Sequence, residues 1–181
     1  TPEDALTDPI VGALLDRLGE LGTIVVCAAG NEATARPRFP AAFAPWRYGP
    51  GTRAAEAGRV PLVSVGALNP NGLTDALFSN TGPWVRAWSP GAAVMSTMPS
   101  FQGGLEPVAR TWVEGRQRES IDPDDFRSGF GIWSGTSFSA PLLAGRLARA
   151  LTPLLEKTAL PQDAVDRGWR AVEALTDLRR P

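Results

Sequence analysis

Residues 8–29 read "DPIVGALLDRLGELGTIVVCAA" and decide the fold class, because a helical pattern runs directly into a strand pattern. We expect Asp8 to cap the helix, Pro9 to take its first position and Gly22 to end it. The apolar residues between them recur at helical spacing, so one face of the helix should be buried. That face carries Ile10, Val11, Leu14, Leu15, Leu18 and Leu21.

Residues 23–29, "TIVVCAA", follow as a short strand that is apolar on both faces. Such strands are typical of a parallel sheet covered by helices. Cys27, the only cysteine of the chain, lies in this run, so we expect it to be buried and exclude an internal disulfide. A helix followed by a buried strand indicates an α/β fold.

Further elements follow along the chain. Three more strands are expected at 60–68, 84–89 and 92–97. Residues 98–130 show no clear period, and the polar stretch 116–129 is interpreted as a surface loop. Two helices close the chain, one over 137–155 and one over about 162–178, after Pro161. Their expected apolar positions are Phe138, Leu142, Leu147, Leu151 and Leu154, then Val165, Trp169, Val172 and Leu175.

Composition limits the classes of function. A chain of 181 residues with 43% hydrophobic residues is most simply one domain or a large piece of one. Eighteen basic against nineteen acidic residues, without long runs, give no footprint for nucleic acid or an anionic membrane. No stretch approaches the ~20 apolar residues that a membrane span needs. Because the chain has no histidine, it cannot complete an imidazole-based triad or metal site by itself.

Asn31 follows the first strand in the stretch "CAAGNEA". At the carboxyl end of a strand in an α/β sheet, side chains meet ligands, and the small residues before Asn31 leave room for one. The Asn31 amide could donate hydrogen bonds there. Alternatively, Gly30 and Asn31 form an ordinary turn, since both tolerate positive φ, and this stretch alone favours the turn.

Ser137 stands at a helix start in "SGTSFSAPLLAG", residues 134–145. Unpaired N–H groups and the helix dipole would stabilise an oxyanion beside it. Alternatively, Ser137 or Ser139 is a simple N-cap, with Pro141 tolerated in the first turn. The stretch is not the nucleophile elbow of α/β hydrolases, because its next glycine is Gly145.

Taken in order, six stretches resemble landmarks of the C-terminal half of subtilisin-like serine proteases, over residues 8–151. They are "AAGNE" (28–32), "FPA" (39–41), "VPLVSVGAL" (60–68), "FSNTGPWVRAWSPG" (78–91), "ST" (96–97) and "SGTSFSAPLLAG" (134–145). Sedolisins share the Gly-Thr-Ser signature but have aspartate where Asn31 stands. The resemblance implies a three-layer, parallel-sheet α/β fold. Residues 1–181 would be the C-terminal part of one peptidase domain, with 98–133 a long loop atypical of the family and 161–181 a terminal helix.

The resemblance also implies a serine endopeptidase that acts through an acyl-enzyme. Ser137 would be the nucleophile, Asn31 and the Ser137 backbone N–H the oxyanion hole, and Thr136 its support. Leu142 stands where relatives commonly have histidine and is expected to be a packing residue. No metal or cofactor is implied, although a structural calcium is left open. Substrate would lie against Ala28, Ala29, Gly30, Phe39, Pro40 and Gly135.

The aspartate and histidine of the triad precede the asparagine in this family, so we expect them on an upstream segment absent from this chain. Without them the chain should be inactive, because an unassisted serine hydroxyl is a poor nucleophile. Expected partners are a peptide or protein substrate and that upstream part, without nucleic acid or a membrane span. A parallel sheet without its first strands would expose apolar edges and associate tightly or precipitate. The resemblance favours secretion or the cell envelope.

Two other functions stay open. The protein could be a non-catalytic, peptide-binding pseudoprotease module of the same fold, whose upstream segment lacks the aspartate or histidine. It could also be an unrelated α/β binding domain, in which Asn31 and Ser137 lie far apart. Four aromatic residues in 98–133 either form a rim over the site or anchor the loop to the core. They are Trp112, Phe126, Phe130 and Trp133.

Overall fold

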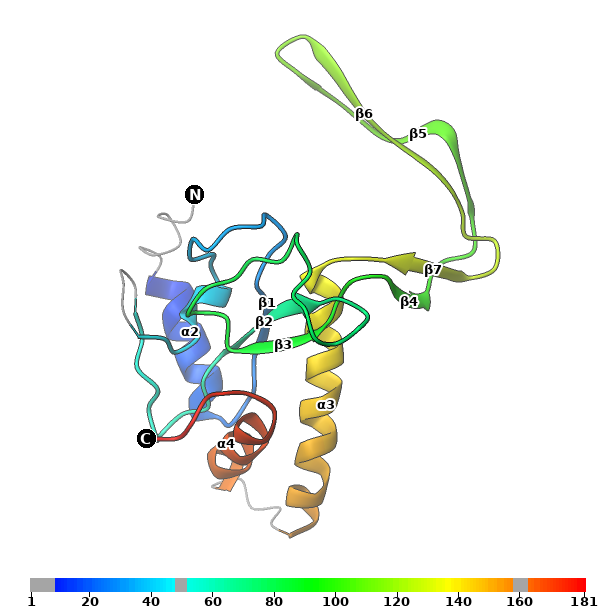
Figure 1. Ribbon diagram of the computed structural model, residues 1–181. Helices are drawn as coiled ribbons and strands as arrows, with labels where there is room; N and C mark the ends of the chain where they lie inside the picture. The colour runs from blue at the N-terminus through cyan, green and yellow to red at the C-terminus, as the bar shows by residue number, and fades with distance from the viewer. Residues whose placement is uncertain (1–8, 48–51, 158–162) are drawn as a thin grey trace. The chain divides into compact units, whose positions relative to one another are not determined.

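The computed structural model describes residues 9–47, 52–157 and 163–181 (Figure 1). The chain divides into two compact units. The first comprises Thr1–Ala92 and Ser134–Pro181, and the second comprises Ala93–Trp133. Each unit has its own sheet or sheets, so we describe them separately.

The first unit is built on a parallel sheet with the strand order β1-β2-β3. The strands are β1 (Val26–Ala28), β2 (Val63–Leu68) and β3 (Ala87–Pro90), each within or beside an expected strand and each shorter than expected. The α/β class predicted from the sequence is therefore confirmed. β1 is half-buried rather than buried, because no strand of the described chain pairs with its outer edge.

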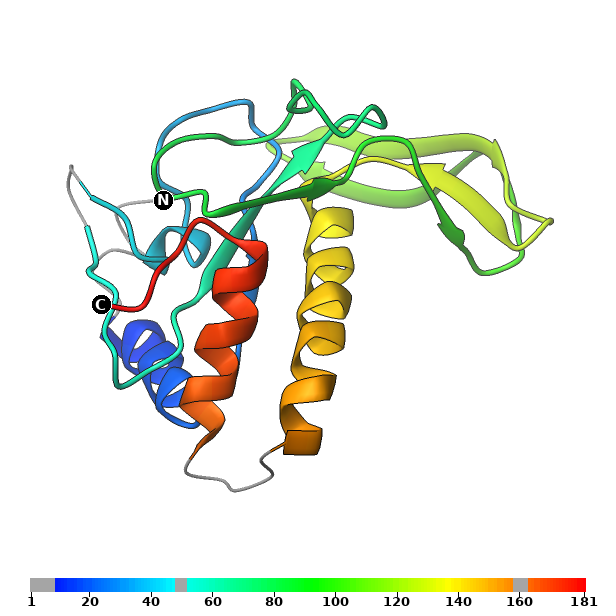
Figure 2. The ribbon, with the colours of Figure 1, turned by 60° about the horizontal axis from the view of Figure 1, so that its bottom comes forward.

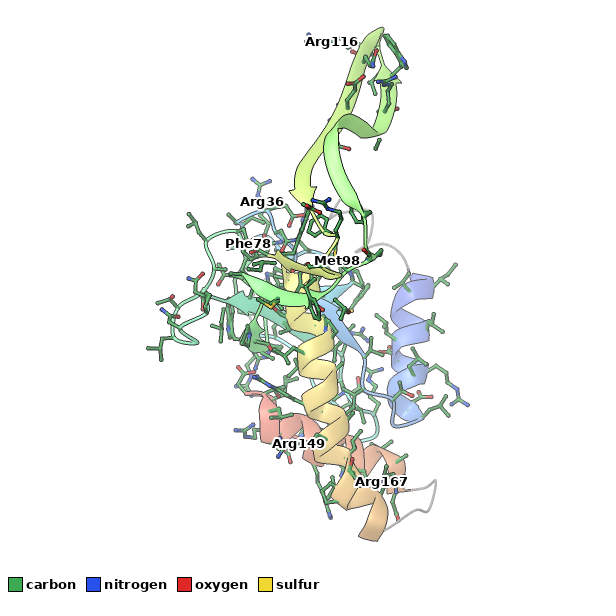
Figure 3. The ribbon with its side chains drawn as sticks, turned by 90° about the vertical axis from the view of Figure 1, so that its right-hand side faces the viewer. Arg36, Phe78, Met98, Arg116, Arg149 and Arg167 are labelled. Atoms are coloured by element: carbon green, nitrogen blue, oxygen red, sulfur yellow. The ribbon has the colours of Figure 1, made fainter. Side chains whose placement is uncertain are left out.

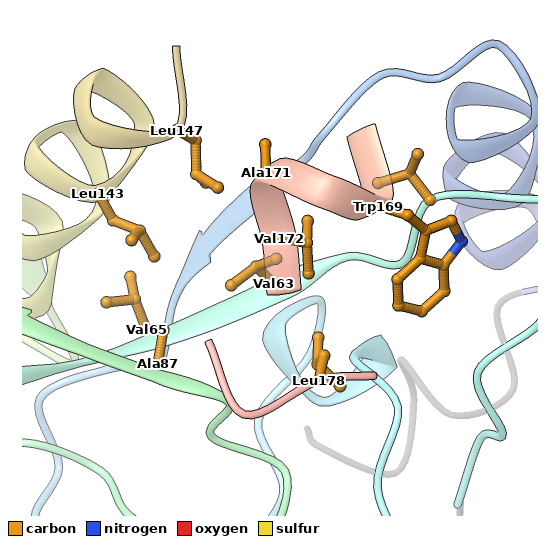
Figure 4. Close-up of a cluster of buried hydrophobic side chains, with 10 residues drawn as sticks. Val63, Val65, Ala87, Leu143, Leu147, Trp169, Ala171, Val172 and Leu178 are labelled. Carbon is orange, nitrogen blue, oxygen red and sulfur yellow. The ribbon is translucent and has the colours of Figure 1, made fainter. Parts of the chain in front are cut away.

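One face of the sheet packs on two helices, α3 (Thr136–Lys157) and α4 (Ala164–Leu175), which run side by side (Figure 2). Alternate strand residues such as Val63 and Val65 point to this face and are fully buried. The close-up in Figure 4 shows them meeting the helices, and Trp169 belongs to the same buried cluster. Burial of these apolar side chains is the main stabilising term for the layer.

The other face of the sheet packs on a short 3-10 helix, η1 (Ala41–Phe43), and on tryptophans. Cys27 is half-buried against this second cluster, whereas it was expected to be fully buried. Gly66 of β2 faces the Trp88 ring, and a Cβ there would come within 2.3 Å of it. Both faces are thus covered, as a parallel sheet requires.

Helix α2 (Pro9–Glu20) forms as predicted, and Gly22, which has φ 79°, lies just after its end. The Thr23 N–H donates to the Leu18 carbonyl at 3.0 Å, a bond of the type that closes a helix at a left-handed glycine. Asp8, the expected cap, lies outside the described residues. The prediction of a buried stripe is wrong for several positions, because only Leu15 and Leu18 are half-buried. The exposed ones are Ile10 (77%), Val11 (36%), Leu14 (59%) and Leu21 (57%).

The helices near the C-terminus lie where the sequence places them, but two of the expected apolar positions, Leu142 and Leu175 (36%), are exposed. Leu143 and Leu147 are each 2% exposed and pack on the sheet, whereas Leu142, expected to be a packing residue, is 39% exposed. Residue 142 lies one position away from 143 on the helix, so it is turned by about 100°. The expected terminal helix is α4, and residues 176–181 after it are not helical. Pro161 lies outside the described residues.

The second unit corrects the prediction of a loop over 98–133. It holds β4 (Val94–Thr97) paired antiparallel with β7 (Phe130–Trp133), and β5 (Gln102–Val113) paired antiparallel with β6 (Arg116–Asp125). Glu114 and Gly115, both at positive φ (51° and 76°), make the turn of the long hairpin. Because most of β6 is polar, its alternation left no hydrophobic period to detect.

The four aromatic residues of this unit differ in burial. Phe126 is 4% exposed, and its ring centroid lies 5.0 Å from that of Phe101 and 6.4 Å from that of Trp133. Trp112, Phe130 and Trp133 are 64%, 55% and 45% exposed. Phe126 therefore anchors its own unit, and the rim interpretation stays a prediction. In the described part of the chain, no helix has the length and apolarity to cross a bilayer.

We expect Leu143→Ala to lower the free energy of unfolding by about 2–5 kcal/mol, because it opens a cavity under α3. Leu142→Ala, next to it on the exposed side, should cost about 1 kcal/mol or less. Urea unfolding of the two variants measures the difference, and equal losses would contradict the packing described above.

Candidate active site

The start of α3 is tied to the end of β3. The Gly135 N–H donates to the Gly91 carbonyl at 2.8 Å, and the Ser139 hydroxyl donates to the Ser89 carbonyl at 3.0 Å. A Cβ on Gly91 would lie 2.1 Å from the Ser139 Oγ, so glycine permits this close approach. Ser137 follows in the first turn of α3 and is exposed.

Asn31, which follows β1, contacts the start of α3 through its side chain. Its Oδ1 accepts hydrogen bonds from the Thr136 N–H at 2.8 Å and from the Thr136 hydroxyl at 3.0 Å. The Thr136 Oγ1 in turn accepts one from the Gly30 N–H at 3.0 Å. The structure thus brings the Asn31 and Ser137 stretches together, and the alternative in which they lie far apart is wrong.

These bonds also decide between the capping interpretations. The Thr136 N–H is capped by Asn31, a residue 105 positions away, rather than by a neighbouring serine. The Ser139 hydroxyl is buried and donates to a carbonyl, so it does not cap the helix. No capping bond from the Ser137 side chain is found among the described residues. Its exposed hydroxyl therefore makes no stabilising hydrogen bond in the described part of the chain.

Two N–H donors remain available next to Thr136. Because Oδ1 of Asn31 is occupied, the Nδ2 end of the same amide is its free end, and within the described ranges it meets no acceptor. The backbone N–H of Ser137 also meets no acceptor there, as is usual for the first turn of a helix. The site therefore combines a hydroxyl, two unused donors and the positive end of a helix dipole.

The loop that carries Asn31 is held by Asn80, a fully buried residue that the sequence analysis did not single out. Asn80 Oδ1 accepts from the Glu32 and Thr34 N–H groups, each at 3.1 Å, and Nδ2 donates to the Ala29 carbonyl at 2.9 Å. Its partners lie 46 to 51 positions away in the sequence, so no local periodic pattern could reveal this role. The turn interpretation of Asn31 is compatible with its side-chain bonds, because it lies in a bend.

The residues expected to contact substrate lie as follows. Ala29 is 1% exposed and Ala28 is half-buried in β1, while Gly30 is half-buried with φ 104°. Phe39 packs on the same cluster as Ala29, and Pro40 is exposed. Gly135 is buried beside Asn31, since a Cβ there would lie 3.5 Å from the Asn31 Nδ2. Their contact with a substrate stays a prediction.

Two titratable groups near the loop are perturbed. The Arg38 guanidinium, 3.1 Å from Glu32, is the main cause that lowers the pKa of the Glu32 carboxyl, and Asn80 adds to it. Burial raises the pKa of the Cys27 thiol to about 11, so it is not a thiolate nucleophile at neutral pH. The residues that the structure describes include no cluster of three or more His, Cys, Asp or Glu able to hold a metal ion.

Comparison with known proteins gives one family. The model of the subtilase family matches residues 5–165. The extracellular basic protease of Dichelobacter nodosus is 30% identical over 155 residues, which cover 84% of this chain and 20% of that protein. The structure of the prenylagaramide maturation protease PagA matches 80% of this chain and 38% of its own, with 19% identity and a TM-score of 0.46. The chain thus spans about a fifth of the length of the curated relative.

We expect Thr136→Val to lower the free energy of unfolding by about 1–3 kcal/mol, because it leaves the Gly30 N–H without its acceptor at nearly constant volume. Thr136→Ser keeps the hydroxyl and loses one methyl group, so it should cost about 1 kcal/mol. Denaturant midpoints and the exchange rate of the Gly30 amide proton measure both effects. Equal loss of protection at Gly30 in the two variants would count against the hydroxyl bridge.

Proposed function

Because the chain belongs to the subtilase family, we propose that it is part of a serine endopeptidase in which Ser137 attacks the scissile carbonyl to form an acyl-enzyme. The observation that carries this proposal is the junction at Thr136, which joins the Asn31 amide to the residue preceding Ser137. Acyl transfer to a serine hydroxyl needs no cofactor, so any calcium would be structural.

In this proposal the Asn31 Nδ2 and the Ser137 N–H form the oxyanion hole. Negative charge develops on the carbonyl oxygen during attack, and donors already fixed in place stabilise it without reorganising. The bonds to Thr136 hold the Asn31 amide with its donor end free, which supports this assignment. Thr136 is then a positioning residue. Ala28, Ala29, Gly30, Phe39, Pro40 and Gly135 would border the substrate.

The general base and its orienting carboxylate would come from an upstream segment that carries histidine and aspartate, since residues 1–181 contain no histidine. Residues 1–181 are then the C-terminal part of one peptidase domain. Within the described residues no strand pairs with the outer edge of β1, and several apolar side chains of α2 are exposed. Both observations support this partner, because parallel sheets and apolar helix faces are normally covered. β1 leads directly to Asn31, so a strand added there would end near the site.

The substrate would be a peptide or protein chain. We further propose secretion, supported by the relative that is an extracellular protease.

A fluorophosphonate probe should label Ser137 in the full-length gene product, because the upstream segment supplies the base. Residues 1–181 alone should label far more slowly. Ser137→Ala should abolish labelling, whereas Ser128→Ala, which alters an exposed serine of the second unit, should leave it unchanged. A folded full-length protein that resists the probe would instead be the non-catalytic module.

Asn31→Asp separates catalysis from structure. An aspartate keeps the oxygen that accepts from Thr136, so the free energy of unfolding should be retained. It removes the Nδ2 donor and adds negative charge where the oxyanion would form. We expect kcat to fall by about 10²–10³, the loss measured for one oxyanion-hole donor in a subtilisin. Steady-state kinetics beside thermal unfolding provide the test, and an unchanged kcat would remove Asn31 from the mechanism.

A further inference from the structure

The Asn80 side chain is hydrogen-bonded to the loop that carries Asn31, although the two residues are far apart in the sequence. Asn80 is 0% exposed, and its side chain uses every hydrogen-bonding position of its amide. Oδ1 accepts from the Glu32 and Thr34 N–H groups, and Nδ2 donates to the Ala29 carbonyl and to the Glu32 carboxylate at 2.5 Å. A buried amide satisfied in this way specifies one conformation of what it touches.

The backbones of the two segments are also joined. The Asn80 N–H donates to the Gly30 carbonyl at 2.9 Å, the Ala33 N–H donates to the Phe78 carbonyl at 3.0 Å, and the Thr81 N–H donates to the Thr34 carbonyl at 3.0 Å. Phe78, which begins the second segment and accepts from Ala33, is labelled in Figure 3. Segment 78–81 is thus fastened along segment 29–34.

None of these bonds is made by Asn31 itself. They hold Ala29 and Gly30 before it and Glu32, Ala33 and Thr34 after it. The Asn31 side chain is held separately by Thr136. The direction of the Asn31 amide therefore depends on two sets of hydrogen bonds. Thr136 holds the side chain, and segment 78–81 holds the backbone on both sides of Asn31.

We propose that Asn80 is a positioning residue, which keeps the Asn31 amide aligned with Ser137 for oxyanion stabilisation. This inference rests on the proposed function. A misplacement of about 1 Å in a catalytic group can cost roughly 10²-fold in rate. Loss of Asn80 should therefore lower kcat more than it weakens substrate binding, although no hydrogen bond joins Asn80 to Asn31 in the described part of the chain.

Glu32 fixes which way the Asn80 amide faces. Its carboxylate, paired with Arg38, accepts from the Nδ2 end, while two N–H groups point to the Oδ1 end. An aspartate at position 80 would place a second carboxylate against Glu32. Asn80→Asp is therefore not a conservative change, and Asn80→Ala is the cleaner test.

The test compares Asn80→Ala with Ser64→Ala in the full-length gene product. Ser64 is also 0% exposed and its Oγ also accepts from a backbone N–H, that of Arg86 at 3.0 Å, at the opposite end of the strands. We expect Asn80→Ala to lower kcat by about 10–100-fold with KM changed less than about 3-fold. Ser64→Ala should leave kcat nearly unchanged. Equal kcat losses in the two variants would overturn the proposal.

A double-mutant cycle shows whether Asn80 acts through Asn31. In the Asn31→Asp background, adding Asn80→Ala should cost less than about 3-fold in kcat, because the donor it positions is already absent. A full additive loss would overturn the proposal.

Amide exchange gives a readout independent of activity. Asn80→Ala should speed exchange at Glu32 and Thr34, whereas Ser64→Ala should not. If the wild-type protein has no peptidase activity, the proposed function fails, and the exchange rates alone then decide whether Asn80 holds the loop. Unchanged exchange at both amides would reject the proposal.

Discussion

The structure depends most on the buried hydroxyl and N–H of Thr136. These groups bind Asn31 and Gly30 across more than a hundred residues, and they join the end of β1 to the start of α3. A buried hydroxyl that donates to one partner and accepts from another contributes geometry as well as stability, because leaving either partner unpaired is costly. The same contact selects which end of the Asn31 amide remains free, so the fold and the chemistry share one constraint.

The parallel sheet explains why this contact can form. Strands that run in one direction bring their carboxyl ends to the same edge, so segments that follow β1 and β3 meet there. The close approach at Gly91 lets the start of α3 reach that edge. Buried clusters on both faces of the sheet fix the strands, and the polar groups of Asn80 and Thr136 then fix the loops. Apolar packing fixes the positions of the strands and helices, and hydrogen bonds fix the loops of the candidate site.

The exposed side of the first unit fits the same picture. The outer edge of β1, which pairs with no strand among the residues that the structure describes, and the exposed apolar side chains of α2 are surfaces that proteins normally cover. A segment that carries a general base would cover them and act beside Ser137. One complementing chain would thus meet both the structural and the chemical need, which is why we link the two in the proposed function.

The sequence by itself determined the α/β class and the approximate positions of the strands and helices of the first unit, and its resemblance to a family pointed to Asn31 and Ser137 as candidate site residues. The fold class and the elements follow from local hydrophobic periodicity, and the two candidate residues follow from short motifs that occur in a fixed order. Both kinds of signal lie in short stretches of the chain. Only the tertiary structure decided that 102–125 is a hairpin, that Leu142 and much of the α2 stripe are exposed, that Asn31 caps α3 and that Asn80 holds the loop. The hairpin is largely polar, so it has no hydrophobic period. The exposure of a stripe depends on what covers it, and bonds between residues 46 to 105 positions apart exist only once the chain has folded.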